Sequence, residues 1–221
     1  MIKGIYFDDV HSYHDLNLVL NAGGIDIPPA EPKTNYIDVP GGDGSLDFTE
    51  GLGRVTYKDR PCTFKFTLNP NGDLSQEAFE EKKTEISNLL NGKACKITLD
   101  KDPDYYYQGR CKVDEHAQDR HLLQFTVSAV VRPYKLKQTE TVVTVDLSST
   151  EKEVILMNSR KPVVPLITCT NDNTVVSFGD SQTTLSEGTH KVLDFCLSEG
   201  ENIFKVSGSG MITFTYQEGE L

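Results

Sequence analysis

The 221-residue chain has no tryptophan and lacks the short motifs of common enzymes and metal centres. It contains no CxxC pair, no HExxH and no GxSxG, the patterns of zinc or redox sites, zinc proteases and serine hydrolases. No apolar run approaches a membrane span, and the N-terminus MIKGIYFDDV has neither the basic start nor the apolar core of a signal peptide. We therefore expect a protein that is made in the cytoplasm, contacts no membrane, needs no cofactor or metal and is not an enzyme.

Positive charge is also scarce, because 22 Lys and Arg residues face 33 Asp and Glu residues. The formal net charge is −11 and the sequence pI is about 4.9, so the overall field repels a phosphate backbone. With 37% hydrophobic and 25% charged residues, the composition is that of a folded globular protein. Stable nucleic-acid binding is not expected.

The five cysteines form an odd count and lie far apart along the chain. Four of them stand beside apolar residues at the two-residue spacing of a strand face: Cys62, Cys95, Cys111 and Cys169. Free cysteine is among the residue types that are most often buried. We expect buried, reduced thiols, with a disulfide or metal role as the weaker alternative.

The most distinctive segment present runs from Tyr36 to Leu68 and places an acidic, glycine-rich loop between two extended stretches. Glycine enters left-handed backbone conformations without strain, so this loop can turn sharply or reach outward as an arm. The stretch that follows alternates cleanly, with Cys62, Phe64, Phe66 and Leu68 on one face.

The loop does not match the phosphate or calcium motifs that its residues suggest. A P-loop requires a Lys and a Ser or Thr entering a helix, and Asp43 and Asp47 would repel an anion. Alternating oxygen ligands of a calcium loop are present, but its sixth position is Phe48 and its twelfth is Arg54. The run Asp100, Asp102, Asp104 fails in the same way. We interpret both stretches as exposed acidic turns.

His11 and His14, with acidic neighbours at positions 8, 9 and 15, are the best metal candidate. Two histidines three residues apart converge on a helix but diverge on an extended chain. The flanking sequence favours an extended chain, so we do not expect a metal site.

The first part of the chain predicts strands with a single helix. Short strands are expected around residues 5–7 and 16–20. The helix is predicted from a capping box at Asp73 and Gln76, an apolar stripe from Phe79 to Leu90 and a stop at Gly92. A hairpin is expected from strands 95–99 and 105–113, followed by a long strand over 123–131 that ends at Pro133.

After residue 137 no helical period recurs, and about seven short strands predict a small β-sandwich. The expected strands cover residues 143–147, 154–157, 166–169, 175–178, 192–197, 203–206 and 211–216. Carbohydrate-binding modules share this architecture, but the aromatic residues alternate with aliphatic ones and are expected to pack in a core: Phe178, Phe195, Phe204, Phe214 and Tyr216. The predicted fold class is mainly β, with an α+β N-terminal domain over 1–137 and a β-sandwich over 138–221.

Several segments, taken in order, resemble the distal tail proteins (Dit) of siphophages and prophages of Gram-positive bacteria. FDDVHSYHDLNLVL resembles the family's first strands, VPGGDGSLDFTE its long loop and YKDRPCTFKFTL the strand after it. A strand ending in VRPYK resembles the close of the N-terminal ring domain, which is sandwich-like or split-barrel-like. KPVVPLITCT and GENIFKVSGSGMITFTY resemble the galectin-like or carbohydrate-module-like sandwich appended to it.

The resemblance implies a virion structural protein at the phage tail tip. In this family the N-terminal domains form a hexameric ring that serves as a baseplate hub. The ring seats the tail tube on one side and the tail-associated lysin or fibre on the other, and receptor-binding proteins attach at the periphery in some cases. The glycine loop is then an arm that contacts a neighbouring subunit or the tube, with these candidate interface residues: Gly41, Gly42, Asp43, Ser45, Asp47 and Thr49. An acidic lumen would let DNA pass through the ring without retaining it.

Two alternatives from other classes remain at this point. One is a carbohydrate-binding or receptor-binding accessory protein of the tail, which the absence of tryptophan disfavours. The other is a tail-tube subunit of related fold, for which the C-terminal sandwich is superfluous.

Overall fold

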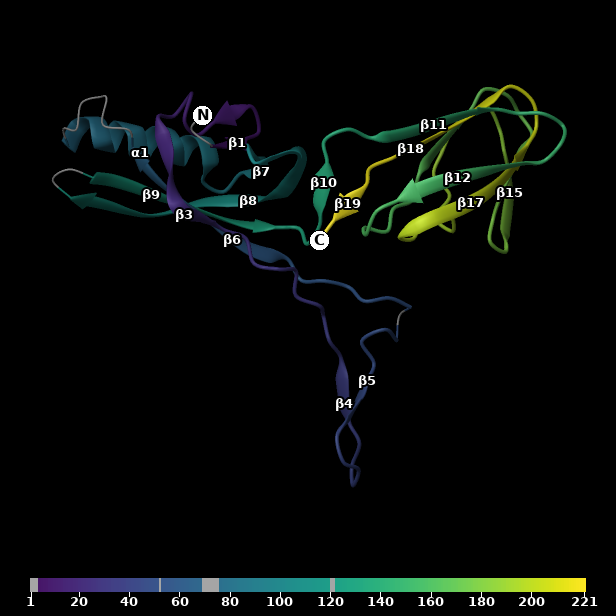
Figure 1. Ribbon diagram of the computed structural model, residues 1–221, viewed down its shortest axis with the longest axis horizontal. Coiled ribbons are helices and arrows are strands. Elements are labelled where there is room, and N and C mark those ends of the chain that lie inside the picture. The colour runs from purple at the N-terminus through teal and green to yellow at the C-terminus, as the bar shows by residue number, and fades with distance from the viewer. Residues whose placement is uncertain (1–3, 52, 69–75, 120–121) are drawn as a thin grey trace. The chain divides into compact units, whose positions relative to one another are not determined.

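The computed structural model describes residues 4–51, 53–68, 76–119 and 122–221, and the side chains of 76 and 115–123 lie outside the description. The chain divides into two compact units, Met1–Lys135 and Leu136–Leu221 (Figure 1). The fold is mainly β, with one helix among the described residues. The predicted fold class is confirmed.

The N-terminal unit is built on one antiparallel sheet with the strand order β2-β1-β7-β8-β9-β6-β3. Its strands are β1 (Ile5–Phe7), β2 (Val10–His11), β3 (Leu18–Asp26), β6 (Arg60–Leu68), β7 (Ala94–Leu99), β8 (Asp102–Asp119) and β9 (Leu122–Val131). The predicted hairpin is present as β7 and β8, and the strand predicted to end at Pro133 is β9. The β8 strand begins at Asp102, three residues earlier than expected, because the turn occupies only Asp100 and Lys101.

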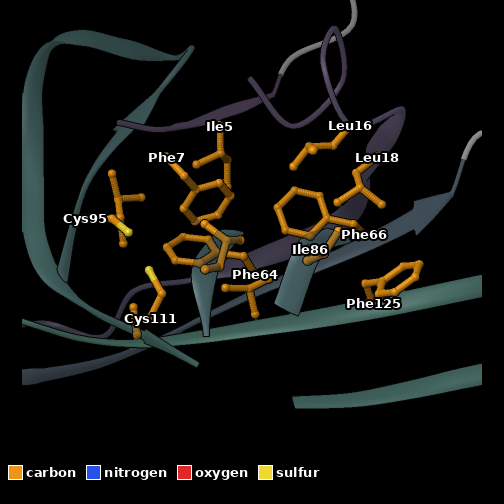
Figure 2. Packing of buried hydrophobic residues seen from close by; sticks show 14 of the residues in the cluster. Ile5, Phe7, Leu16, Leu18, Phe64, Phe66, Ile86, Cys95, Cys111 and Phe125 are labelled. Atoms are coloured by element: carbon orange, nitrogen blue, oxygen red, sulfur yellow. The ribbon is translucent and has the colours of Figure 1, made fainter. Parts of the chain in front are cut away.

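The sheet curls over its own core. Three strands separate β1 from β6, so in a flat sheet they would be roughly 19 Å apart at about 4.8 Å per strand. Yet the ring centroid of Phe7 lies 6.1 Å from that of Phe64 and 6.3 Å from that of Phe66. Figure 2 shows these rings gathered with Ile5 and Ile86 in one buried cluster. The two ends of the sheet therefore face each other as two layers.

Helix α1 (Gln76–Leu90) contributes its predicted apolar stripe to this core. Phe79, Ile86 and Leu90 are buried, and the Phe79 ring lies 5.5 Å from that of Phe125. The helix stops as expected at Gly92, which has a φ of +77°. The predicted capping box lies outside the described residues at Asp73.

The C-terminal unit is a sandwich of two four-stranded antiparallel sheets, ordered β11-β18-β13-β16 and β12-β17-β14-β15. The first sheet contains β11 (Thr141–Asp146), β13 (Leu166–Cys169), β16 (Gly188–His190) and β18 (Met211–Tyr216). The second contains β12 (Lys152–Asn158), β14 (Thr174–Phe178), β15 (Ser181–Leu185) and β17 (Gly200–Ser207). The short strand β10 (Lys135–Lys137) pairs with β19 (Gly219–Glu220).

The aromatic residues of this unit pack between its sheets, as predicted. Phe195, Phe204 and Phe214 are fully buried, and Phe178 stacks on Phe204 at 4.4 Å. The prediction of a strand over 192–197 is wrong. That segment turns, with the Phe195 amide bonded to the Val192 carbonyl at 3.1 Å, and it fills the core from a loop. Strands β15 and β16 were not expected, because their sequences are polar.

Candidate assembly surface

The glycine loop belongs to a long arm that leaves the sheet between β3 and β6. Its outer part is a two-stranded hairpin of β4 (Tyr36–Asp38) and β5 (Ser45–Asp47), which Figure 1 shows extending from the sheet of the N-terminal unit. Every residue of both strands is exposed. The hairpin thus has no contact with the core to hold it in place.

The hairpin tip uses its glycines as turn residues. Gly41 and Gly44 have φ values of +79° and +78°, and the Gly42 amide donates to the Val39 carbonyl at 3.0 Å. Across the strands, the Ser45 hydroxyl donates to the Asp38 carboxylate at 2.6 Å. These bonds fix the turn and the pairing of the two strands.

One side of the hairpin is apolar. Ile37 and Leu46 lie opposite each other in the register. Val39 and Phe48 follow two residues beyond them, so they continue the same side. All four are 41–53% exposed. Five of the seven exposed large apolar residues in the described N-terminal unit lie on the arm: Tyr36, Ile37, Val39, Leu46 and Phe48.

The opposite side is acidic and carries Tyr36, Asp38, Ser45 and Asp47. Hydrogen bonds from Thr49 lower the pKa of the exposed Asp47 carboxyl, which keeps it ionised. The segment 36–53 contains four acidic residues and no basic one. The hairpin is therefore a ribbon with one apolar side and one acidic side.

The predicted interface residues lie at the tip and on the acidic side. Gly41, Gly42 and Asp43 form the tip, and Ser45 and Asp47 lie on β5. Thr49 follows β5, where its hydroxyl accepts a hydrogen bond from the Asn35 amide at 3.1 Å. Their role in an interface stays a prediction. Sequence reasoning missed the apolar side, although the alternation at 37/39 and 46/48 signals it.

The root of the arm is tied together by backbone bonds. Pro32 and Tyr57 form an isolated bridge, and the Lys33 amide donates to the Thr56 carbonyl at 2.8 Å. The Lys58 amide returns a bond to the Glu31 carbonyl at 2.8 Å. The outgoing and returning segments of the arm are therefore paired where they leave the sheet.

Arg60 anchors this root from inside the unit. It is 6% exposed, its Nε donates to the Pro28 carbonyl at 2.7 Å, and one terminal nitrogen donates to the Pro133 carbonyl at 3.2 Å. Its guanidinium also lies 5.5 Å from the centroid of the Tyr107 ring. Arg60 thus joins the start of the arm to the segment that follows β9.

The two histidines do not diverge as expected, because the chain turns after β2. The Asp15 amide donates to the His11 carbonyl at 3.1 Å, and the two imidazole rings lie 4.5 Å apart. His11 is buried: its Nδ1 accepts from the amides of Tyr13 and His14, and its Nε2 lies 3.2 Å from an Asp100 carboxylate oxygen. These contacts connect the turn after β2 to Asp100 through the His11 side chain.

The four cysteines predicted to be buried are buried, and Cys196 is exposed. Burial raises the pKa of Cys62 to about 11 and raises the pKa of Cys95, Cys111 and Cys169 as well. These four thiols remain protonated at neutral pH and react slowly.

The described residues offer no other site with evident chemistry. No three or more His, Cys, Asp or Glu side chains among them converge as metal ligands, and no helix among them is long and apolar enough to cross a membrane. In the C-terminal unit, no exposed large apolar residue is aromatic, so no exposed aromatic ring is available there to stack on a sugar. The arm carries most of the exposed large apolar side chains of the described N-terminal unit.

Comparison with known proteins identifies the fold. No protein-family model matches the chain, and no curated protein matches it. Among solved structures, the chain is similar to the Dit protein (gp 19.1) of SPP1, described as a paradigm of the hub adsorption apparatus in phages that infect Gram-positive bacteria. The superposition covers 100% of both chains with a TM-score of 0.69 at 14% sequence identity. The chain has a Dit-like fold.

Proposed function

We propose that this protein is a structural component of a phage tail tip, where it forms the hub between the tail tube and the adsorption machinery. The observation that supports this most is the end-to-end similarity to SPP1 Dit, which extends over both units rather than over one common sandwich. A plain tube subunit has no need of the second unit. The role is mechanical and requires no catalytic group.

In this proposal the N-terminal unit builds a hexameric ring, and the arm supplies a contact between subunits or with the adjoining tube. An isolated two-stranded hairpin is marginally stable in water, and an exposed apolar face marks an interaction site. Heterologous contacts that close on themselves produce rings. Burial of Ile37, Val39, Leu46 and Phe48 would then stabilise both the arm and the ring.

The ring would contact the tail-tube protein on one side and a tail-associated lysin or fibre on the other, and the C-terminal units would carry further receptor-binding proteins. The protein would reside in the virion after synthesis in the host cytoplasm. DNA would pass through the ring without stable binding, in keeping with the net charge of −11.

The test is the mass of the intact chain in solution, measured for the wild type and for Leu46→Ser/Phe48→Ser. We expect a sixfold species for the wild type and a folded monomer for the variant, because two apolar contacts are removed from the interface. Ile155→Ser/Ile203→Ser is the matched control, since those aliphatic side chains are similarly exposed in the C-terminal unit. Normal rings from the arm variant would contradict the role assigned to the apolar side.

A further inference from the structure

The outer face of the central sheet is basic, although the protein as a whole is acidic. The inward side of β6, β8 and β9 is defined by buried pairs such as Phe64 with Val127 and Cys111 with Ala129. The alternate positions point outward. Over β7, β8, β9 and β6 these outward positions include four cations, which we call the basic face: Lys65, Lys96, Arg110 and Lys112.

The registers place these cations around β9. Lys65 of β6 lies opposite Thr126, and Lys112 of β8 lies opposite Ser128, the next outward position on β9. The next outward position on β9 is Val130, which lies opposite Arg110 of β8 on one side and Pro61 of β6 on the other. The basic face thus extends from β6 to β7, with cations on β6, β8 and β7 and neutral side chains on β9.

Carboxylates of the described chain neutralise only part of this face. Lys112 pairs with Asp114 at 2.6 Å, whereas no described carboxylate pairs with the other three cations. Arg110 instead donates to the Gly92 carbonyl, and the Lys96 ammonium lies 4.7 Å from the centroid of the Tyr106 ring. The nearby acidic residue on β3 is Asp26, opposite Thr63. Val130, at an outward position of β9, is an apolar residue that is 58% exposed. A basic face with an exposed apolar centre fits an acidic, partly apolar partner.

The arm has the matching chemistry. Its acidic side places Asp38 and Asp47 at diagonal positions on adjacent strands, because Asp38 lies opposite Ser45 and Asp47 lies two residues further along β5. Tyr36 lies opposite Asp47 and is 59% exposed. Lys65 and Lys112 are also offset by two residues along the sheet, although β9 lies between their strands.

We propose that the acidic side of the arm docks on the basic face of a second copy of this chain. The inference rests on the ring role proposed above and names the surface that receives the arm. The apolar side of the docked ribbon would contact a further subunit of the ring, so the arm would lie between two subunit surfaces. Nucleic acid is the competing ligand for a basic face, but the net charge of −11 disfavours it.

Charge reversal tests this pairing in the intact chain. Asp38→Lys/Asp47→Lys alters the arm, and Lys65→Glu/Lys112→Glu alters the sheet at exposed positions away from the core. Each variant alone sets like charges against each other, and we expect its self-association to be at least about tenfold weaker. Asp180→Lys/Glu201→Lys makes the same +4 change in net charge as the arm variant, at exposed C-terminal positions, and should assemble as the wild type does.

Mixing the two charge-reversed variants is the decisive step. In an alternating ring every lysine-bearing arm meets a glutamate-bearing sheet and every native arm meets a native sheet, so the mixture should recover the wild-type mass. Circular dichroism spectra of each variant would establish that it is folded.

The outcomes separate this inference from the ring role. If the wild type forms rings and the charge-reversed variants form them equally well, or if their mixture fails to recover assembly, the docking surface is wrong and the ring role stands. If the wild type remains monomeric, the ring role fails and the docking falls with it. If Lys65→Glu/Lys112→Glu leaves assembly intact but abolishes a gel shift of duplex DNA seen with the wild type, nucleic acid is the ligand of the basic face and the proposal is overturned.

Discussion

At the scale of single residues, Arg60 is a buried charge that holds two backbone segments together. Its hydrogen bonds satisfy two carbonyls, at Pro28 and Pro133, that no strand ladder uses, and its plane lies over an aromatic ring. Since the bonds are charge-assisted and buried, each contributes more than an exposed pair would. Arg60 thereby holds Pro28, at the start of the arm, to Pro133, which follows β9.

Replacing Arg60 with Met should therefore lower the free energy of unfolding of the N-terminal unit by about 3 kcal/mol, since it orphans both carbonyls. Urea denaturation followed by far-ultraviolet circular dichroism measures this. Lys58→Met is the control, because its pair with Glu31 is exposed, and it should cost less than about 1 kcal/mol. An equal loss in both variants would show that Arg60 has no special role.

The buried thiols predict a loss of stability in alkali. Cys62 has an unfolded pKa near 9 and a folded pKa of about 11, so between these values the unfolded chain gives up a proton that the folded chain keeps. The unfolded state then binds fewer protons, and stability falls by up to about 1.4 kcal/mol per pH unit for this group. Unfolding of Cys62→Ala and wild type from pH 8 to 11 should show a shallower decline in the variant; parallel curves would contradict the assignment.

At the scale of elements, the arm should be separable from the fold that carries it. Its outgoing and returning segments are already joined at the Pro32–Tyr57 bridge. Every residue of β4 and β5, which lie beyond this bridge, is exposed. Removing 41–51 should leave the melting temperature of the monomer nearly unchanged while abolishing assembly. Mass measurement and thermal unfolding of the same preparation check both halves. A deletion variant that still assembles would show that the arm is dispensable.

The elements that sequence reasoning predicts are those with a strong local period. The helical spacing of Phe79, Ile86 and Leu90 predicts α1, and the apolar alternation from Cys62 to Leu68 predicts β6. The edge strand β15, with the sequence SQTTL, is polar and leaves no such signal. The segment 192–197 has apolar residues at a suggestive spacing, but they enter the core from a turn.

The candidate site was only partly predictable for a related reason. Glycine and aspartate locate the tip of the arm, because turn chemistry is local. The apolar side combines residues from both strands, so it becomes visible only when Ile37 is placed opposite Leu46. The basic face combines β6 with the hairpin of β7 and β8, which lies more than 25 residues further along the chain. The curl of the sheet brings Phe7 to Phe64 without any local signature.

At the scale of the whole molecule, each unit has a core of its own, which predicts independent folding. Residues from both sheets of the C-terminal unit form its core. Within the same unit, the Lys137 amide donates to the Glu218 carbonyl and the Lys137 ammonium donates to the Glu218 carboxylate. A fragment over 136–221 should unfold cooperatively with the same midpoint as the corresponding transition of the intact chain. A fragment without a cooperative transition would show that this unit depends on the other.

The proposed hub requires the chain to self-assemble, which sedimentation analysis of the intact wild-type chain over a range of concentrations measures. We expect a species with six times the 24.6 kDa mass of the chain, which the arm variants lose and the control variants retain. A wild-type chain that sediments as a monomer at every concentration would contradict the proposed ring.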